Sequence, residues 1–352
     1  DVSNGYDMDL AVINDQLMIR RGSELWVSDG TGVGTWELTA QIPNVGQLEA
    51  FTPFGDKLFF GVQDVNTGYW QYWVTDGTPT QTFSITAPTN LENRVTNTLA
   101  FGNSILFDYG DPVHGKELWI NDGTPGSILL KDIGPESFGS FDITFNSFFA
   151  TDGTKAFFTA HTPQLGHELW CTDGTPEGTR LIKDIASGTY SSSPSHTAML
   201  NGVAYFSADV DNDIELWRSD GTEAGTWKVT DPDNDEYGLK PQELVTAGSK
   251  IIFTAEKTEN DREIWITDGT EMGTYMLHDV YPGSWSSSPT SLRASGEYVY
   301  FLANDGVSGQ EVWRTDGYNL EPFEIRLGPE GAEARELTIV NDLLYLSAFD
   351  HN

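Results

Sequence analysis

Two short acidic segments hold the residues whose types and spacing best suit metal binding. They carry aspartates at alternate positions: Asp209, Asp211, Asp213 and Asp231, Asp233, Asp235. Calcium takes about six to eight oxygen ligands, and alternating carboxylates in a tight turn can supply several of them. We therefore predict bound Ca²⁺ at one or both segments. The alternative is that both are solvated acidic loops that hold no ion.

Neither segment matches the helix-flanked calcium loop, which has Gly at its sixth position. Ile214 and Glu236 stand at that position here. The six histidines show no zinc-like spacing, and the chain has no glycine-rich phosphate loop and no Gly-x-Ser-x-Gly motif. Paired carboxylates of a glycoside hydrolase stay open as an alternative, because the chain has 53 Asp and Glu residues.

A tryptophan-centred motif recurs along the chain and must position any such site. It is clearest at residues 168–175, which read Glu-Leu-Trp-Cys-Thr-Asp-Gly-Thr and are followed by Gly178 and Thr179. The same frame occurs at seven tryptophans: Trp26, Trp73, Trp119, Trp170, Trp217, Trp265 and Trp313. Successive tryptophans lie 46 to 51 residues apart. A period of this size indicates a solenoid, a propeller or a repeat array.

Each repeat contains the pattern of four short strands. In the unit from 289 to 317, apolar or aromatic runs at 289–294, 298–303 and 311–315 are separated by turn residues, and a fourth run follows the Asp-Gly pair. Such runs, bounded by Gly, Asp and Asn, are typical of strands and hairpins. The second strand carries a column of large apolar residues at Phe60, Phe107, Phe158, Phe206, Phe253, Phe301 and Leu346. We expect this column to fill the space between stacked sheets.

The acidic residues of the motif are expected to serve the fold. Asp-Gly is a strong hairpin signal, because Gly adopts positive φ and Asp hydrogen-bonds nearby backbone. We interpret the Glu that opens six of the motifs as a structural acceptor, a role that Gln71 would keep in the seventh. Cys171 is expected to be a small packed residue. The serine-rich links at 191–194 and 286–289 are expected to be ordered connectors.

The motif of residues 168–179 resembles that of the bacterial ELWxxDGT-repeat proteins, also known as hyalin-like repeat proteins. Its turn is similar to the Asp-box of sialidase-type propellers. The resemblance covers essentially the whole chain, and it implies a secreted or surface-attached β-propeller without an established reaction. The chain departs from the motif at 71–73, at Ile264 and Val312 in the Leu position, and after Gly317.

We predict an all-β fold, a β-propeller of four-stranded antiparallel blades that forms a single domain over 1–352. Seven blades are favoured and eight are an alternative, because residues 336–352 add an extra terminal hairpin. That hairpin would supplement the first blade, form half of an eighth blade or complete a neighbouring molecule. Propellers of about four to eight blades are known.

The composition of the chain excludes some kinds of binding partner. The net charge is −34, from 19 Lys and Arg against 53 Asp and Glu. So acidic a chain repels phosphate backbones and anionic lipids, so we expect no nucleic-acid partner. No run of about 18 apolar residues occurs, so we expect no membrane insertion. The chain starts at Asp1 without an apolar leader, so a signal peptide has been removed or none existed.

These observations favour a secreted or cell-surface binding or adhesion module that is stabilised by calcium. Its partner would be a protein or glycan at one face. Tyr190, Trp285 and Trp70 are expected to be exposed in loops and are candidates for stacking on sugars. One alternative is a structural subunit that self-assembles through the terminal hairpin. Another is a carbohydrate-active enzyme. We identify no catalytic residue, because equal repeats give no indication of a single site that breaks the symmetry.

Overall fold

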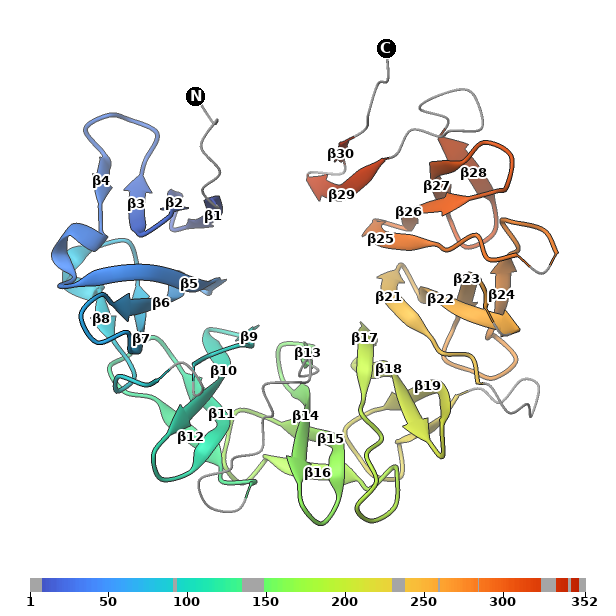
Figure 1. Cartoon of the computed structure of the whole chain (residues 1–352), viewed down its shortest axis with the longest axis horizontal. Helices are drawn as coiled ribbons and strands as arrows, with labels where there is room; N and C mark the ends of the chain where they lie inside the picture. The colour runs from blue at the N-terminus through green and yellow to red at the C-terminus, as the bar shows by residue number, and fades with distance from the viewer. Residues whose placement is uncertain are drawn as a thin grey trace. The chain divides into compact units, whose positions relative to one another are not determined.

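The computed structural model describes residues 8–90, 94–134, 149–229, 238–258, 260–283, 285–323, 334–340 and 343–347. Within these residues the strands form seven four-stranded antiparallel sheets and one two-stranded hairpin (Figure 1). The helical turns in the same ranges are two 3-10 helices, η1 (Thr39–Gln41) and η2 (Pro79–Gln81). The chain is therefore all-β, as its sequence predicts.

The chain divides into two compact units. Unit 1 holds residues 1–164 and 170–180, and unit 2 holds residues 165–169 and 181–352. Three sheets lie wholly in unit 1: β1 (Met8–Ile13), β2 (Gln16–Arg21), β3 (Glu24–Ser28), β4 (Thr35–Glu37); β5 (Val45–Phe54), β6 (Lys57–Asp64), β7 (Trp70–Thr75), β8 (Phe83–Ser84); β9 (Thr98–Phe101), β10 (Ser104–Asp111), β11 (Gly115–Asn121), β12 (Ile128–Lys131).

The boundary between the units runs through the fourth sheet, whose strands are β13 (Phe149–Thr151), β14 (Ala156–Thr162), β15 (Gly166–Thr172) and β16 (Arg180–Lys183). The remaining strands lie in unit 2: β17 (Ser195–Leu200), β18 (Val203–Val210), β19 (Asp213–Ser219), β20 (Trp227–Lys228); β21 (Gln242–Ala247), β22 (Lys250–Thr258), β23 (Asp261–Thr267), β24 (Tyr275–His278); β25 (Thr290–Ser295), β26 (Tyr298–Asn304), β27 (Gln310–Thr315), β28 (Leu320–Phe323); β29 (Arg335–Val340), β30 (Leu343–Ser347).

Every four-stranded sheet follows the order of the chain, each strand pairing antiparallel with the next. Each sheet is thus one sequence repeat folded on itself. The fold is a β-propeller of four-stranded antiparallel blades, with seven such blades and one hairpin in the described part of the chain. The sequence-based prediction of fold class is confirmed. Within this part of the chain, no helix is long and apolar enough to cross a membrane.

The register of the strands explains the spacing of the two repeated aromatic positions. Phe253 on β22 lies opposite Trp265 on β23, and Phe301 on β26 lies opposite Trp313 on β27. The column residues from Phe60 to Phe301 are at most 1% exposed, as expected for side chains between sheets. The offset of 11 to 13 residues between Phe and Trp varies with the length of the turn, and the cross-strand pairing stays the same from blade to blade.

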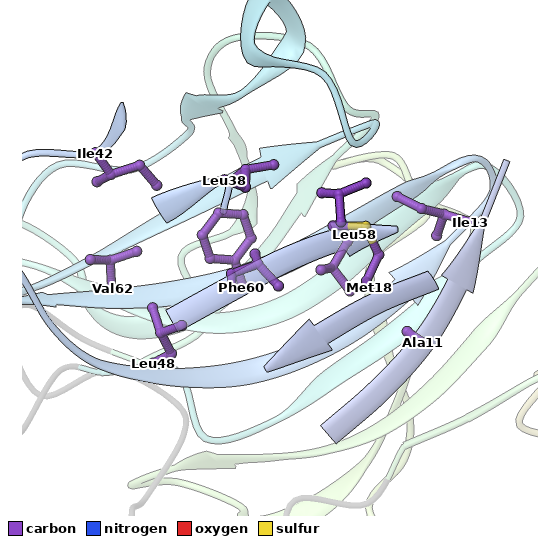
Figure 2. Close-up of a cluster of buried hydrophobic side chains, with 11 residues drawn as sticks. Ala11, Ile13, Met18, Leu38, Ile42, Leu48, Leu58, Phe60 and Val62 are labelled. Atoms are coloured by element: carbon purple, nitrogen blue, oxygen red, sulfur yellow. The ribbon is translucent and has the colours of Figure 1, made fainter. Parts of the chain in front are cut away.

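Side chains of neighbouring sheets interleave to form the core. In unit 1, Met18 of the first sheet packs with Leu58 and Phe60 of the second (Figure 2). Unit 2 repeats the arrangement between its own successive sheets. Burying a large apolar side chain contributes about 1.5–3 kcal/mol, so these layers supply most of the favourable free energy of folding.

The terminal hairpin β29–β30 packs against the sheet β25–β28. Leu337 joins Leu302 and Val312 in a small buried cluster, and Leu344 and Leu346 pack against it. Leu343 and Tyr345 alternate with them and are 59% and 53% exposed. The hairpin therefore has one covered face and one open face.

Candidate functional site

The first acidic segment is the tip of a β-hairpin. Val210 on β18 pairs with Asp213 on β19, and Asp211 and Asn212 form the turn with φ of 59° and 70°. Side chains alternate between the two faces of a strand. Asp209 therefore faces the opposite side of the hairpin from Asp213, whose Oδ2 lies 3.3 Å from the amine of Lys228.

The structure thus does not bring the carboxylates of Asp209 and Asp213 together for one ion. In the described ranges no group of three His, Cys, Asp or Glu side chains is placed to hold a metal. The second segment, with Asp231, Asp233 and Asp235, lies outside the described residues. Calcium at that segment stays a prediction.

A cavity of 460 Å³ opens in unit 2, beside the hairpin that holds Asp209. Connector residues 185–187 and 190–191 line one side, and hairpin residues 209–212 line the other. Tyr190 is 74% exposed at its mouth. Oδ1 of Asp209 is shielded from solvent and accepts no hydrogen bond from the described residues. An aromatic plane beside a carboxylate acceptor suits a ligand that carries a hydrogen-bond donor on an apolar body.

The connector that lines this cavity is held by the repeated glutamate. Glu168 is fully buried and accepts hydrogen bonds from the backbone of Ile185 (2.9 Å) and Ser192 (3.1 Å) and from the Ser192 hydroxyl (2.7 Å). Glu263 is fully buried in the same way. Burial raises the pKa of both carboxyl groups, against the lowering effect of these hydrogen bonds. The interpretation of the repeated Glu as a structural acceptor is confirmed at these positions.

The repeated Asp is a structural acceptor in an exposed turn. Oδ1 of Asp268 accepts hydrogen bonds from the backbone (2.9 Å) and hydroxyl (2.7 Å) of Thr270, which hold the pKa of Asp268 below its usual value. The same carboxylate explains why the motif has Gly at position 273. A methyl group on Gly273 would lie 2.1 Å from Oδ1 of Asp268, so only Gly fits beside this carboxylate.

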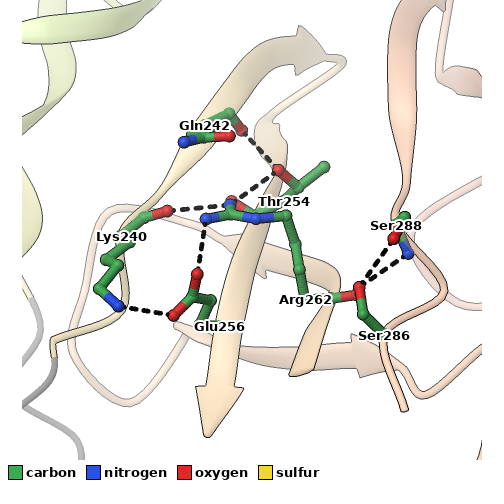
Figure 3. A network of polar contacts seen from close by, with 7 residues as sticks. All are labelled: Lys240, Gln242, Thr254, Glu256, Arg262, Ser286 and Ser288. Carbon is green, nitrogen blue, oxygen red and sulfur yellow. Dashed lines mark hydrogen bonds and ion pairs between the residues drawn. The ribbon is translucent and has the colours of Figure 1, made fainter. Parts of the chain in front are cut away.

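A polar network anchors the start of β21 in the same unit (Figure 3). Arg262 donates to the carbonyl of Lys240 (2.9 Å) and lies 3.3 Å from the carboxylate of Glu256. Lys240 in turn lies 2.8 Å from Glu256. Each charge in this network has an opposite partner, so the network secures the entry to the strand and leaves no group aimed at a ligand.

Unit 1 contains a smaller pocket of 240 Å³ at a departure from the motif. Tyr72 replaces the usual Leu, and its hydroxyl donates to Glu49 (2.7 Å) and accepts from the backbone of Val95 (2.6 Å). Arg94 lies 2.9 Å from the other oxygen of Glu49. Burial raises the pKa of Glu49. Sequence reasoning missed this group, although the change at 71–73 was its visible signal.

The burial of the three candidate sugar-stacking aromatics and of Cys171 tests the remaining expectations from the sequence. Tyr190 and Trp285 are 74% and 67% exposed, as expected for loop aromatics. The expectation that Trp70 is exposed is wrong: it begins β7 and is 2% exposed. Cys171 is buried, which raises the pKa of its thiol and agrees with a packed structural role.

No protein-family model and no curated protein matches this chain. Solved structures do. A prolyl endopeptidase aligns over 90% of this chain and 49% of its own, with a TM-score of 0.52 and 11% identity. Oligopeptidase B from Leishmania major aligns over 97% and 53%, with a TM-score of 0.50 and 9% identity. The same enzyme from Trypanosoma brucei, with covalently bound antipain, aligns over 97% of this chain and 52% of its own, with a TM-score of 0.50 and 11% identity.

At these identities the likeness shows the fold alone, and the chain spans about half the length of the peptidases it matches. The finding nevertheless corrects one expectation from the sequence. The solved structures named above are peptidases, which overturns the interpretation of the chain as a binding or adhesion module. These neighbours agree better with the enzyme alternative than with adhesion.

Proposed function

We propose that this propeller serves a peptidase, by holding peptides for a catalytic domain of the prolyl oligopeptidase kind. The observation that carries the proposal is the alignment of 90–97% of the chain with about half the length of such enzymes. One of these structures is described in terms of inter-domain dynamics in catalysis and specificity. A propeller in such an enzyme can act on specificity without contributing a reacting group.

The cavity beside Asp209 supports a peptide ligand. Peptides present N–H donors and apolar side chains together, and this cavity is lined by both an acidic residue, Asp209, and an aromatic one, Tyr190. A net charge of −34 attracts cationic peptides and repels acidic ones over long distances. The peptides that bind should therefore be neutral or basic.

Two further parts of the proposal rest on the sequence alone. An extracellular or cell-surface location follows from the resemblance to secreted repeat proteins. Calcium at residues 231–235 follows from the alternating aspartates of that segment.

The test offers residues 1–352 a tryptic peptide mixture and, separately, a set of oligosaccharides. Bound molecules are measured by equilibrium dialysis and mass spectrometry, with the heat-unfolded chain as control. We expect the folded chain to retain a reproducible set of neutral or basic peptides and to cleave none of them. Retention of oligosaccharides without peptides, or retention of neither, would overturn the proposal.

A further inference from the structure

Two connectors in unit 2 have the same anchors. Glu263 accepts hydrogen bonds from Val280 (2.8 Å) and from the backbone (2.8 Å) and hydroxyl (2.7 Å) of Ser287. Glu168 makes the equivalent contacts with Ile185 and Ser192. The two connectors, 184–194 and 279–289, can therefore be compared residue by residue.

The hairpin beside each connector is also equivalent. The backbone N–H of Asp209 donates to the carbonyl of Ser192 (2.8 Å), and that of Asn304 donates to the carbonyl of Ser287 (2.9 Å). Each connector thus lies at the same place against the β-hairpin that follows it. The hairpin tips differ in length: two residues, 211–212, join β18 to β19, and five residues, 305–309, join β26 to β27.

The space beside the second connector is filled by an aromatic ring. Tyr281 packs against the hairpin backbone, because a methyl group on Gly306 would lie 2.3 Å from Cζ of this ring. The ring stacks on Trp285, with centroids 6.4 Å apart and planes 26° apart. A tyrosine supplied by the chain itself therefore lies between the connector and the hairpin tip.

In the first connector, Ala186 stands at the position of Tyr281, and Tyr190 stands at that of Trp285. The 460 Å³ cavity lies there, between connector and hairpin. Its volume falls in the range of about 300–1,000 Å³ that is typical of ligand sites. The cavity lies where the first connector has no counterpart of the Tyr281 ring, and the exposed Tyr190 can stack on a ring that enters it.

We propose that this cavity binds the side chain of a tyrosine from a peptide, with the ring on Tyr190 and its hydroxyl donating to Asp209. Asp209 lines the cavity, and its carboxylate is the acceptor assigned to the phenol. A hydrogen bond to a charged acceptor distinguishes tyrosine from phenylalanine. The inference deepens the proposed function, since it names the residue that a bound peptide presents.

The experiment titrates the chain with N-acetyl-tyrosinamide and measures binding by ligand-observed NMR, with N-acetyl-phenylalaninamide and N-acetyl-argininamide beside it. We expect saturable binding of the tyrosine amide, about tenfold tighter than the phenylalanine amide. Asp209→Asn should reduce that preference. No saturable binding, or tighter binding of the arginine amide, would overturn the proposal.

Two variants locate the site. Ala186→Tyr should fill the cavity as Tyr281 fills its counterpart, and should abolish binding while the unfolding temperature stays the same or rises. Tyr281→Ala should open the counterpart, where Asn304 stands at the position of Asp209, so any second site there should not prefer the tyrosine amide over the phenylalanine amide. Tyr190→Ala provides a second loss of binding if Ala186→Tyr does not fold. Equal binding by the original chain and both loss variants would contradict the assignment.

This design separates the inference from the proposed function. If the tyrosine amide binds at the cavity but no peptide is retained, the cavity assignment stands and the peptide-handling function falls. If peptides are retained equally by the chain and by Ala186→Tyr, the function stands and the cavity assignment falls.

Discussion

Connectors are anchored in two ways in this molecule. In unit 2, Glu263 gathers three donors from Val280 and Ser287 with one buried carboxylate. In unit 1, the corresponding motif begins with Gln71, and Tyr72 holds the chain near Val95 through its hydroxyl. The connector is therefore held by a carboxylate in one repeat and by a phenol hydroxyl in the other.

The difference shows what the repeat preserves. A buried backbone N–H without an acceptor costs free energy, so each connector needs an acceptor but not a particular residue. In the second repeat, the Tyr72 hydroxyl supplies that acceptor and donates its own hydrogen bond to Glu49. The acid has moved from the motif strand to the first strand of the same sheet. The pocket at Glu49 and Arg94 results from this exchange.

Breaking the regular anchor should have the largest effect. Glu263→Ala leaves the backbone N–H groups of Val280 and Ser287 and the Ser287 hydroxyl buried without their acceptor, and should cost about 3 kcal/mol or more of unfolding free energy. Urea denaturation measures it. Glu263→Gln, which keeps one acceptor oxygen, should cost less. Exposed Glu271→Ala is the matched control and should change stability by less than about 0.5 kcal/mol. Equal losses in all three variants would contradict this account.

The tyrosine anchor depends on a glycine that gives it room. A methyl group on Gly61 would lie 2.8 Å from Cε1 of Tyr72 and 2.9 Å from Cγ of Glu49. Gly61→Ala should therefore cost about 2 kcal/mol through overpacking. In a Tyr72→Leu background, which restores the usual motif residue, the same change should cost clearly less. A double-mutant cycle measures this coupling. Additive costs would show that Gly61 serves the backbone and not the ring.

The regular parts could be predicted from the sequence because they recur. The Phe and Trp positions repeat at one register, and the motif Glu serves as the same acceptor at Glu168 and Glu263, so each copy supports the others. The sites could not, because they arise where a single copy differs. Glu49 and Tyr72 lie 23 positions apart and meet only in the folded sheet. The cavity lies beside Ala186, where the equivalent connector has Tyr281, and a single alanine gives no local sequence signal of it.

Alternating aspartates fit two structures for a related reason. A spacing of two is what a calcium loop shows, but it is also the period of a strand. At Asp209 and Asp213 the chain turns between the two residues, so their side chains point to opposite faces. Sequence spacing alone does not locate a two-residue turn inside an acidic run.

The pH dependence of stability should separate the buried acid from its surroundings. Burial raises the pKa of Glu263 above its usual 4.5. At a pH between 4.5 and the raised pKa of the folded state, Glu263 keeps a proton in the folded chain that it has lost in the unfolded chain. Its contribution to stability therefore falls as pH rises from 4.5 through the folded pKa. The slope is at most about 1.4 kcal/mol per pH unit. Urea denaturation of the original chain and Glu263→Gln across this range should show a difference that declines with pH. A constant difference would rule the titration out.

The smallest effect should come from the exposed acid of the same motif. Asp268→Ala removes two hydrogen bonds to Thr270 in a solvated turn, where water replaces them, and should cost about 1 kcal/mol or less. The same change removes the carboxylate that excludes a side chain at position 273, so Gly273→Ala should be tolerated better beside Asp268→Ala than alone. Thermal unfolding of the single and double variants measures both effects.

Because the pKa of Asp268 lies below its usual 3.8, its contribution to stability is lost as pH falls through that lower value, opposite in direction to Glu263. A loss from Asp268→Ala as large as that from Glu263→Ala would mean that burial does not set the rank of the two acids.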